Sequence, residues 1–295
     1  MKRTADALRR IGLIANPDKP RSIAVLRRTV TQLRRLGREV LCDATTAGFA
    51  RLRSIPVAAD AAELARRCDL LLVFGGDGTM LRVARESAGS GVPILGVNAG
   101  HLGFLAAVQE TEVSQAIRTV LAGRFRIENR ALLEAVVHSD GSSSVQTALN
   151  DFVLSRGLAS RLIELEVAVN GELLTRYRCD GLIASSPTGS TAYSLAAGGA
   201  IVSPDADVLT LTPICPHTLS IRPVVMSLDS VVQVTLLSRR LEATLAADGQ
   251  QLTHLNTGDK VLIRRSRQSV RLLRPDGGSF FATLREKFGW SGGNL

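Results

Sequence analysis

One short stretch, Gly75-Gly76-Asp77-Gly78-Thr79, combines three glycines with a single acid directly after an apolar run. Glycine permits positive φ angles, and because it has no Cβ the backbone can approach a ligand closely. If a helix begins at this stretch, its first N–H groups can bind a phosphate. A lone carboxylate in such a turn, Asp77, suggests a group that either orients a hydroxyl nucleophile or holds a metal ion. By itself the turn predicts a phosphoryl-transfer site.

A second glycine-bearing loop, residues 98–104 (Asn-Ala-Gly-His-Leu-Gly-Phe), directly follows the next apolar run along the chain. Ligands of open α/β sheets bind outside the carboxyl ends of the strands. We therefore expect this loop to share a crevice with residues 75–79. The spacing NxGxxG is a weak signal alone, but a second glycine-rich strand end strengthens the first.

Two further stretches carry groups suited to a nucleotide. Residues 179–199 run from an apolar segment through Pro-Thr-Gly-Ser-Thr into a helix of small residues, where hydroxyls and free N–H groups suit a ribose, phosphate or amide. Ordinary N-capping by Thr188 or Ser190 is the alternative, and the absence of G-x-S-x-G disfavours Ser190 as a hydrolytic nucleophile. The pair Asn150-Asp151 can bind the two hydroxyls of a ribose, because Asp accepts and Asn both donates and accepts. A simple turn is the other interpretation of this pair.

The elements that must position these stretches follow from hydrophobic periodicity. Strand patterns at 11–15, 39–42, 70–74 and 92–97 alternate with helix patterns at 20–36, 61–67 and 113–121, and residues 43–58 show little pattern. This alternation predicts βαβ units and a mainly parallel sheet. Beyond residue 125, alternating β patterns prevail at 132–138, 144–154, 163–169, 173–177, 208–214, 231–237, 243–247, 260–264 and 269–273, with Asn170-Gly171 as a hairpin turn.

The expected fold class is therefore α/β plus β. A Rossmann-like α/β domain is expected over residues 1–125 and a mainly β domain over residues 126–275. A helix at 280–288 is expected to return the segment 276–295 to the first domain.

Composition narrows the class of protein. The chain has 295 residues, of which 45% are hydrophobic and 21% charged, as is ordinary for a soluble globular protein. Its four cysteines lack CxxC spacing and its four histidines are scattered, which argues against a zinc site and a disulfide framework. No apolar run approaches the ~20 residues of a membrane span, and the N-terminus lacks the apolar region of a signal peptide. We therefore expect a cytoplasmic protein without membrane partners.

The net charge of +9 lies in residues 1–130, whereas residues 131–295 are balanced. The arginines of this half fall mostly on outer helix faces and lack interleaved aromatic residues, which argues against nucleic acid. Four of them, Arg27, Arg28, Arg34 and Arg35, illustrate a solvated basic face. A mild attraction for polyanionic small molecules is the remaining interpretation.

Together, these stretches resemble the bacterial NAD kinase family in order along the whole chain. GGDGT at 75–79 is shared by that family with 6-phosphofructokinases and diacylglycerol kinases, and residues 98–104 are similar to the family's NxGxxGF loop. The segment 180–199 is similar to the NAD kinase signature DG…SSPTGSTAYSLSAGG. Of the three families that share GGDGT, this signature leaves the NAD kinases alone. Two positions depart from the family pattern: Asp151 replaces the usual Glu, and Ala196 replaces the usual Ser.

The resemblance implies an enzyme that transfers the terminal phosphate of ATP to the adenosine 2′-hydroxyl of NAD, giving NADP and ADP with Mg²⁺ as cofactor. The family also uses polyphosphate, and the sequence does not decide between the two donors. It implies an N-terminal α/β domain, a C-terminal β domain and a homodimer or homotetramer. Asp77 is then the catalytic base, and Asp151 contacts a ribose of NAD. A basic residue at the position of Arg178 is associated in the family with rejection of NADH, which implies a preference for NAD. The expected binding residues are Asp77, Gly78, Asn150, Asp151, Arg161, Arg178, Asp180, Thr191, Ala192, Tyr193, Ser194, Leu195, Ala196 and Gln250.

Other classes make distinguishable predictions. A dehydrogenase needs G-x-G-x-x-G after its first strand, where this chain has Ala15-Asn16-Pro17. A diacylglycerol-type lipid kinase shares GGDGT but lacks the TGSTAYSLAAGG stretch. A non-catalytic NAD-binding regulator keeps the binding residues but loses Asp77. The chain also has no GxxxxGK[ST], so a phosphoryl donor is not held as in P-loop enzymes.

Overall fold

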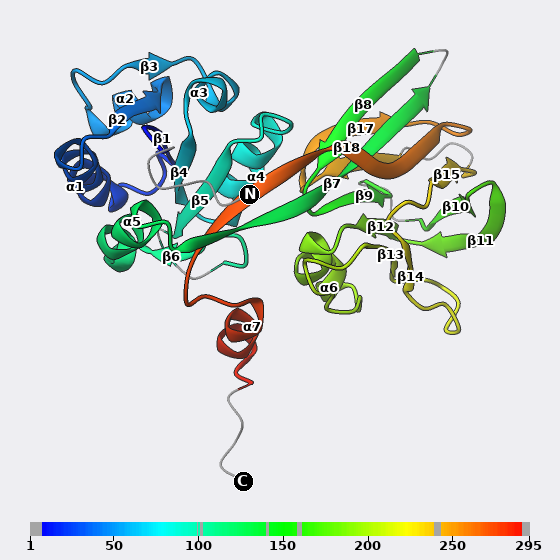
Figure 1. Cartoon of the computed structure of the whole chain (residues 1–295). Coiled ribbons are helices and arrows are strands. Elements are labelled where there is room, and N and C mark those ends of the chain that lie inside the picture. The colour runs from blue at the N-terminus through cyan, green and yellow to red at the C-terminus, as the bar shows by residue number, and fades with distance from the viewer. Residues whose placement is uncertain are drawn as a thin grey trace, which may run out of the picture. The chain divides into compact units, whose positions relative to one another are not determined.

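The computed structural model describes residues 8–98, 100, 103–139, 142–157, 161–238 and 243–290. The chain forms two compact units (Figure 1). Unit 1 contains Met1–Asn129 and Val270–Leu295, and unit 2 contains Arg130–Ser269. The chain passes from one unit to the other within two long strands, β7 (Phe125–Ser139) and β18 (Lys260–Pro275).

Unit 1 is built on a parallel sheet with the strand order β5-β4-β1-β2-β3. The strands are β1 (Arg10–Ala15), β2 (Glu39–Asp43), β3 (Val57–Ala58), β4 (Leu70–Gly75), β5 (Pro93–Asn98) and β6 (Val108–Gln109). Both β6 and the end of β18 pair with β5, also in parallel. Every residue of β4 and β5 is buried, which explains their nearly continuous apolar sequences.

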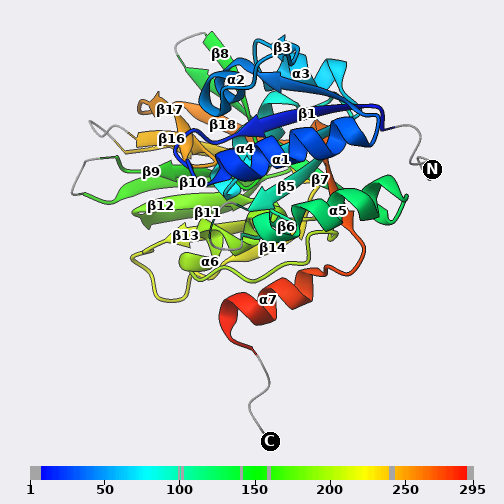
Figure 2. The same ribbon diagram turned by 90° about the vertical axis from the view of Figure 1, so that its left-hand side faces the viewer.

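Helices cover both faces of this sheet (Figure 2). They are α1 (Ser22–Arg35), α2 (Ala44–Ala50), α3 (Ala61–Arg67), α4 (Asp77–Glu86) and α5 (Val113–Leu121), with a 3₁₀ turn η2 (Glu110–Glu112) before α5, and a further helix, α7 (Phe280–Phe288), follows the last strand. Leu26 of α1 and Ile117 of α5 belong to one core cluster with Phe74 of β4. On the other face, a Cβ added to Gly12 of β1 would meet Leu64 of α3 at 2.8 Å. The structure confirms the expected Rossmann-like arrangement.

Unit 2 consists of antiparallel strands in two sheets. One has the order β11-β10-β15-β18, with β7 paired to β18 and β8 to β7, and the other has the order β14-β13-β12-β9-β16-β17. The strands are β8 (Ser142–Ala148), β9 (Asp151–Ser155), β10 (Ile163–Val169), β11 (Glu172–Cys179), β12 (Gly181–Ser185), β13 (Val208–Ile214), β14 (Val224–Ser227), β15 (Val232–Leu236), β16 (Ala243–Ala247) and β17 (Gln250–Leu255). Buried side chains from both sheets, such as Leu165 and Leu182, form one core. This unit confirms the expected mainly β region.

Strongly periodic segments match their predicted elements closely. The helices α3, α5 and α7 have the predicted bounds, and Asn170-Gly171 forms the predicted hairpin turn with φ angles of 53° and 87°. The prediction of a patternless loop at 43–58 is wrong, because α2 and β3 lie within it. The two strands predicted at 260–264 and 269–273 are one strand, β18, and the strands β14 and β17 were not predicted.

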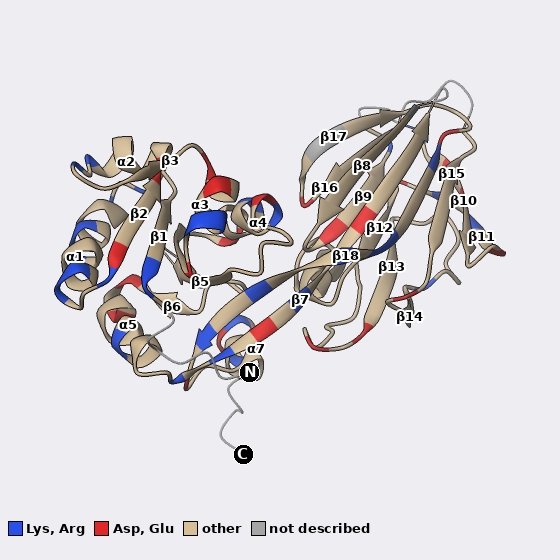
Figure 3. Cartoon of the chain, turned by 45° about the horizontal axis from the view of Figure 1, so that its top comes forward, with Lys and Arg blue, Asp and Glu red and all other residues tan. Residues whose placement is uncertain are grey.

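Lys and Arg residues of unit 1 lie on the helices α1, α3, α4 and α5, and also on β1, β7 and β18 (Figure 3). The arginines named above, Arg27, Arg28, Arg34 and Arg35, are all exposed on α1, as predicted. None of the helices in the described part of the chain has the length and apolar character that a bilayer span requires.

Candidate functional site

The turn at residues 75–79 links a buried strand to a helix. β4 ends at Gly75, and α4 begins at Asp77 with Gly76 as an extended N-cap residue that has no side-chain cap bond. The N–H groups of Thr79 and Met80 both donate to the Gly76 carbonyl, at 3.0 and 3.1 Å. At the start of an α-helix, the N–H groups of Asp77 and Gly78 have no intrahelical acceptor. The turn therefore offers donors for an anion, as the sequence predicted.

The glycines of this turn fulfil one of their two predicted roles. None of them is among the residues with positive φ, so the expectation of left-handed backbone here is wrong. What Gly75 needs is space, because an added Cβ would lie 2.5 Å from Thr79 Oγ1. A Cβ added to Gly76 or Gly78 would meet nothing within 4 Å. These two glycines therefore leave the backbone accessible to a ligand.

The Asp77 carboxylate is held by the second glycine-bearing loop. The backbone N–H of Phe104 donates to Oδ2 at 2.9 Å, and that of Leu105 donates to Oδ1 at 3.2 Å. Gly103 lies so close that an added Cβ would be 1.9 Å from Oδ1. Each carboxylate oxygen has two lone pairs, so each keeps one acceptor site for a further hydrogen.

The parallel pairing of β4 and β5 explains this contact. Gly75 is the register partner of Asn98, so the two loops leave the sheet at the same edge. Asn98 is buried, and its side-chain amide donates to the carbonyl of Gly100 at 2.9 Å, which shapes the loop. The two loops that were predicted to share a crevice are therefore in direct contact, although Ala99, His101 and Leu102 lie outside the described residues.

A second group of residues meets within unit 2. The carbonyl of Asn150 accepts a hydrogen bond from the N–H of Ser186 at 2.8 Å. An added Cβ on Gly189 would lie 2.2 Å from that same carbonyl oxygen. The turn at 150–151 and the Pro-Thr-Gly-Ser-Thr turn therefore pack directly on each other, which brings two of the predicted stretches together.

Asp248 organises this group, and the sequence reasoning missed it. Its carboxylate accepts hydrogen bonds from the backbone N–H groups of Leu149, Asn150 and Asp151 at 3.1, 2.7 and 3.3 Å. Asp248 and Gly249 form the tight turn between β16 and β17, with φ angles of 50° and 70°. The dipeptide Asp-Gly is a recognised hairpin signal and could have located this turn.

Asp151 is buried in unusual electrostatic surroundings. Only 4% of its surface is exposed, and its carbonyl accepts from the N–H of Asp248 at 3.0 Å. Burial, and secondarily the neighbouring charge of Asp248, raises the pKa of Asp151 from 3.8 to about 7. This carboxyl group therefore exchanges its proton near neutral pH.

This raised pKa predicts a pH-dependent stability. Between pH 4 and 7 the folded state retains the Asp151 proton that the unfolded chain has released, so this group makes the free energy of unfolding fall as pH rises. Relative to the Asp151→Asn variant, we expect wild type to lose up to roughly 1.4 kcal/mol per pH unit in that interval. Urea unfolding at several pH values measures the difference. Asp207→Asn, at a side chain that is 80% exposed, is the control, and parallel curves for wild type and Asp151→Asn would refute the prediction.

The hydroxyls of the segment 188–196 are mostly engaged within unit 2. Ser190 Oγ donates to the carbonyl of Pro187 at 2.7 Å and accepts from the N–H of Val202 at 3.0 Å. Ser194 is buried, and its Oγ is 2.9 Å from Thr212 Oγ1. Ser194 therefore offers a ligand its backbone rather than its hydroxyl.

The local structure of this segment also differs from expectation. A 3₁₀ turn, η3 (Thr188–Thr191), is followed by a single helical turn, α6 (Tyr193–Ala196), in place of a longer helix. Neither has a side-chain N-cap bond, so capping by Thr188 or Ser190 is not observed. The remaining predicted residues, Thr191, Ala192, Tyr193, Leu195 and Ala196, are partly or fully exposed.

The other predicted residues are spread over unit 2. Asp180 lies between β11 and β12 and forms an ion pair with Arg156, whose Nε is 2.7 Å from Oδ1. Arg178 on β11 and Arg161 before β10 are exposed at the first sheet, whereas the turn at 150–151 precedes β9 of the second. Gln250 is exposed at the start of β17, beside the Asp248-Gly249 turn.

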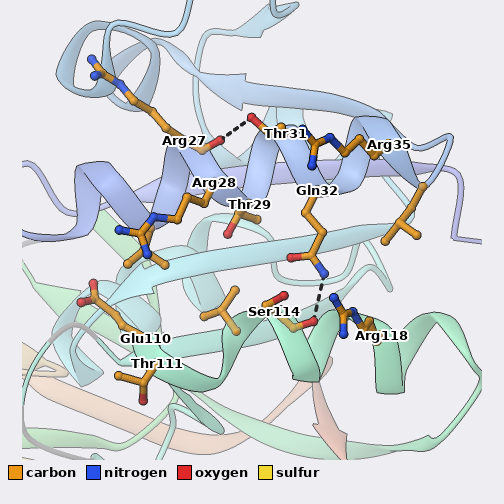
Figure 4. Close-up of a pocket in the computed structure, with 13 residues that line it drawn as sticks. Arg27, Arg28, Thr29, Thr31, Gln32, Arg35, Glu110, Thr111, Ser114 and Arg118 are labelled. Atoms are coloured by element: carbon orange, nitrogen blue, oxygen red, sulfur yellow. Dashed lines mark hydrogen bonds between the residues drawn. The ribbon is translucent and has the colours of Figure 1, made fainter.

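A cavity of about 760 Å³ lies elsewhere in unit 1, between α1 and α5 (Figure 4). Gln32 Nε2 donates to the carbonyl of Ser114 across it, at 2.9 Å. Its lining residues are Val25, Arg27, Arg28, Thr29, Thr31, Gln32, Arg35, Leu36, Glu110, Thr111, Val113, Ser114 and Arg118. It contains no predicted site residue, so the candidate site rests on the contacts of Asp77 and Asp151 instead.

Comparisons with known proteins cover nearly the whole chain. The family description "ATP-NAD kinase N-terminal domain" matches residues 11–125, and "ATP-NAD kinase C-terminal domain" matches residues 149–275. An NAD kinase from Moorella thermoacetica is 42% identical over 280 residues, which are 95% of this chain and 89% of that protein. One from Heliobacterium modesticaldum is 43% identical over 278 residues, or 94% of this chain and 97% of that protein.

Solved structures agree with these matches. A yeast NADH kinase complexed with NADH superimposes with a TM-score of 0.89 at 28% identity, covering 98% of this chain and 89% of that one. An Archaeoglobus fulgidus NAD kinase in complex with ATP has a TM-score of 0.74 at 22% identity, covering 96% of this chain and 100% of that one, and supports the fold alone. These findings support neither the lipid-kinase nor the regulator alternative.

Proposed function

The chain belongs to the NAD kinase family and is an NAD kinase, and we propose that Asp77 is the general base of its reaction. In this proposal Asp77 removes the proton of the adenosine 2′-hydroxyl of NAD while that oxygen attacks the terminal phosphorus of ATP. The bond from this phosphorus to ADP breaks, and NADP and ADP leave. The observation that carries the proposal is the position of the Asp77 carboxylate. Two backbone N–H groups hold it beside a turn whose backbone Gly76 and Gly78 leave accessible.

The geometry of Asp77 suits this task. Phosphoryl transfer depends mainly on positioning and on electrostatic stabilisation. The N–H groups of Phe104 and Leu105 fix the carboxylate plane and leave one lone pair on each oxygen to accept the substrate proton. The free N–H groups at the start of α4, at Asp77 and Gly78, can bind a phosphate of the donor. General bases of this kind contribute roughly 10²–10⁴-fold to rate.

We propose Mg²⁺ as the cofactor of the reaction. Mg²⁺ in nucleotide sites is usually held by phosphates and water with one or two carboxylates, rather than by a cage of protein ligands. Among the described residues no cluster of three His, Cys, Asp or Glu side chains could form such a cage, and Asp77 is the single carboxylate of the glycine-rich turn. This donor set fits an ion carried mainly by the phosphates of ATP. When bound, the ion spreads the charge of the transferred group.

The residues of unit 2 are proposed to hold NAD. Asn150 and Asp151 bind a ribose, and Asp248 supports them by holding their backbone N–H groups. The remaining predicted residues, Asp180, Thr191, Ala192, Tyr193, Ser194, Leu195, Ala196, Arg161, Arg178 and Gln250, contact the nicotinamide and adenine portions, Ser194 through its backbone. Arg178 favours NAD over NADH. We also propose a homodimer or homotetramer in the cytoplasm, on the family resemblance alone.

An assay of purified protein tests these substrate assignments. With NAD, ATP and Mg²⁺ we expect NADP to form, and we expect formation to stop when EDTA removes the metal. NADH in place of NAD is expected to give a much lower rate, and the Arg178→Ala variant is expected to narrow that difference. Product formation with polyphosphate but not with ATP would contradict the proposed donor, and equal rates for NAD and NADH in wild type would contradict the role of Arg178.

A further inference from the structure

The C-terminal helix α7 has little hydrophobic core of its own. Ser279 caps its start by accepting from the N–H of Ala282 at 3.1 Å, and Gly289 ends it with a φ of 63°. Along the helix only Leu284 is buried. Phe281 remains 62% exposed, although the helix is rich in aromatic residues. The helix α7 is therefore held in place by a few specific side-chain contacts.

Three of those contacts converge on a single ring, that of Phe104. The ring centroids of Phe280 and Phe288 both lie 6.3 Å from the Phe104 centroid, and Lys287 Nζ lies 5.4 Å above it. These distances are typical of aromatic pairs and of a cation–π contact. Positions 280, 287 and 288 are spaced i, i+7, i+8, so they share one face of the helix. That face covers Phe104.

The backbone of Phe104 is the same backbone that holds the Asp77 carboxylate. Its N–H donates to Asp77 Oδ2 at 2.9 Å, and its carbonyl accepts from Arg274 Nη2 at 3.0 Å. Arg274 is in turn fixed by Glu128, with Nε 3.2 Å from Oε2. Ring, carbonyl and N–H of residue 104 are thus each bound by a different part of unit 1.

We propose that α7 is a positioning element for Asp77. Its aromatic face fixes the Phe104 ring, and Phe104 then holds the carboxylate in the orientation that accepts the substrate proton. Phe280, Lys287 and Phe288 are in this view positioning residues that touch no substrate. The inference rests on the proposed role of Asp77. It adds that α7 affects the position of the Asp77 carboxylate indirectly, through Phe104.

Phe288→Ala tests the proposal, and Phe281→Ala is the control on the same helix: it removes a ring that contacts Phe280 at a centroid distance of 5.6 Å but leaves the three groups on Phe104 in place. We expect Phe288→Ala to lower kcat at least tenfold, because small displacements of a catalytic group are costly, while KM for NAD changes less than threefold. Phe281→Ala is expected to keep kcat within twofold of wild type, and Phe288→Tyr to restore most of the loss. Unchanged kcat in Phe288→Ala, or equal losses in both alanine variants, would overturn the proposal.

A double-mutant cycle distinguishes positioning from a general loss of structure. If α7 acts through Asp77, adding Phe288→Ala to Asp77→Asn should change the small remaining kcat less than twofold. If the kcat losses of the two single variants multiply in the double variant, α7 acts elsewhere. The inference then fails while the role of Asp77 stands. If Asp77→Asn alone keeps wild-type kcat, the proposed role of Asp77 itself fails. Melting temperatures of all variants are measured in parallel, since a fall shared by Phe281→Ala and Phe288→Ala cannot explain a kcat loss confined to one of them.

Discussion

Asp77→Asn is expected to lower kcat for NADP formation by about 10²–10⁴-fold. The amide has nearly the shape of the carboxylate but cannot accept the proton of the 2′-hydroxyl. It also has only one oxygen for the two N–H donors of Phe104 and Leu105, so one of these hydrogen bonds is lost. Because Asp77 contacts only the 2′-hydroxyl of NAD and the other proposed NAD contacts belong to unit 2, we expect the Kd for NAD to change less than fivefold.

Steady-state assays and calorimetric titration with NAD measure the two quantities separately. Asp69→Asn is a control that removes an acid from the same unit, one that binds the backbone N–H groups of Arg9 and Arg10. It is expected to affect stability rather than kcat. Wild-type kcat in Asp77→Asn would show that Asp77 is not the general base. A large loss of NAD affinity would show that Asp77 acts in binding instead.

Gly103→Ala is expected to be nearly as damaging as the change at Asp77. The new Cβ would lie 1.9 Å from Oδ1, 2.4 Å from Cγ and 2.5 Å from Oδ2 of Asp77, so either the carboxylate or the loop must move. Misplacement of a reacting group by about 1 Å can cost roughly 100-fold in rate. We therefore expect a fall in kcat of about that size with little change in the Kd for NAD.

Gly100→Ala in the same loop is the matched control. An added Cβ there meets nothing within 4 Å among the described residues, whereas one on Gly103 strikes the Asp77 carboxylate. Gly100→Ala should keep kcat within about twofold of wild type. If Gly103→Ala were equally active, or if both variants lost activity alike, the close packing of this loop on Asp77 would not matter for catalysis.

The sequence allowed the parallel sheet and the two glycine-rich loops to be predicted because their signals are local. Buried parallel strands have apolar runs, and the helices α3 and α5 have clear helical periodicity. The helix α2 was missed because Ala44–Ala50 contains few large apolar residues, and its start depends on Asp43, whose carboxylate accepts from the N–H of Thr46 at 3.0 Å. β18 was divided in two because its centre is polar and mostly exposed.

The candidate site shows the same division between local and long-range information. The pattern 75–79 located Asp77, but that its carboxylate is held by residues 104 and 105 depends on the pairing of β4 with β5. Asp248 supports the turn at 150–151 from 97 residues away in sequence, so no local pattern connects them. The positive φ predicted for the glycines of residues 75–79 was wrong: Gly75 is required by the closeness of Thr79, and Gly76 and Gly78 leave the backbone open without a left-handed conformation.

The most direct test of the account is the single-turnover rate of NADP formation with NAD and ATP–Mg²⁺ both bound. Steady-state kcat can be limited by product release, whereas a single turnover reports the phosphoryl transfer that Asp77 is proposed to assist. We predict that Asp77→Asn lowers this rate by at least 100-fold and that Gly103→Ala lowers it more than Gly100→Ala. A single-turnover rate for Asp77→Asn within a few-fold of wild type would contradict the assignment of Asp77 as the general base.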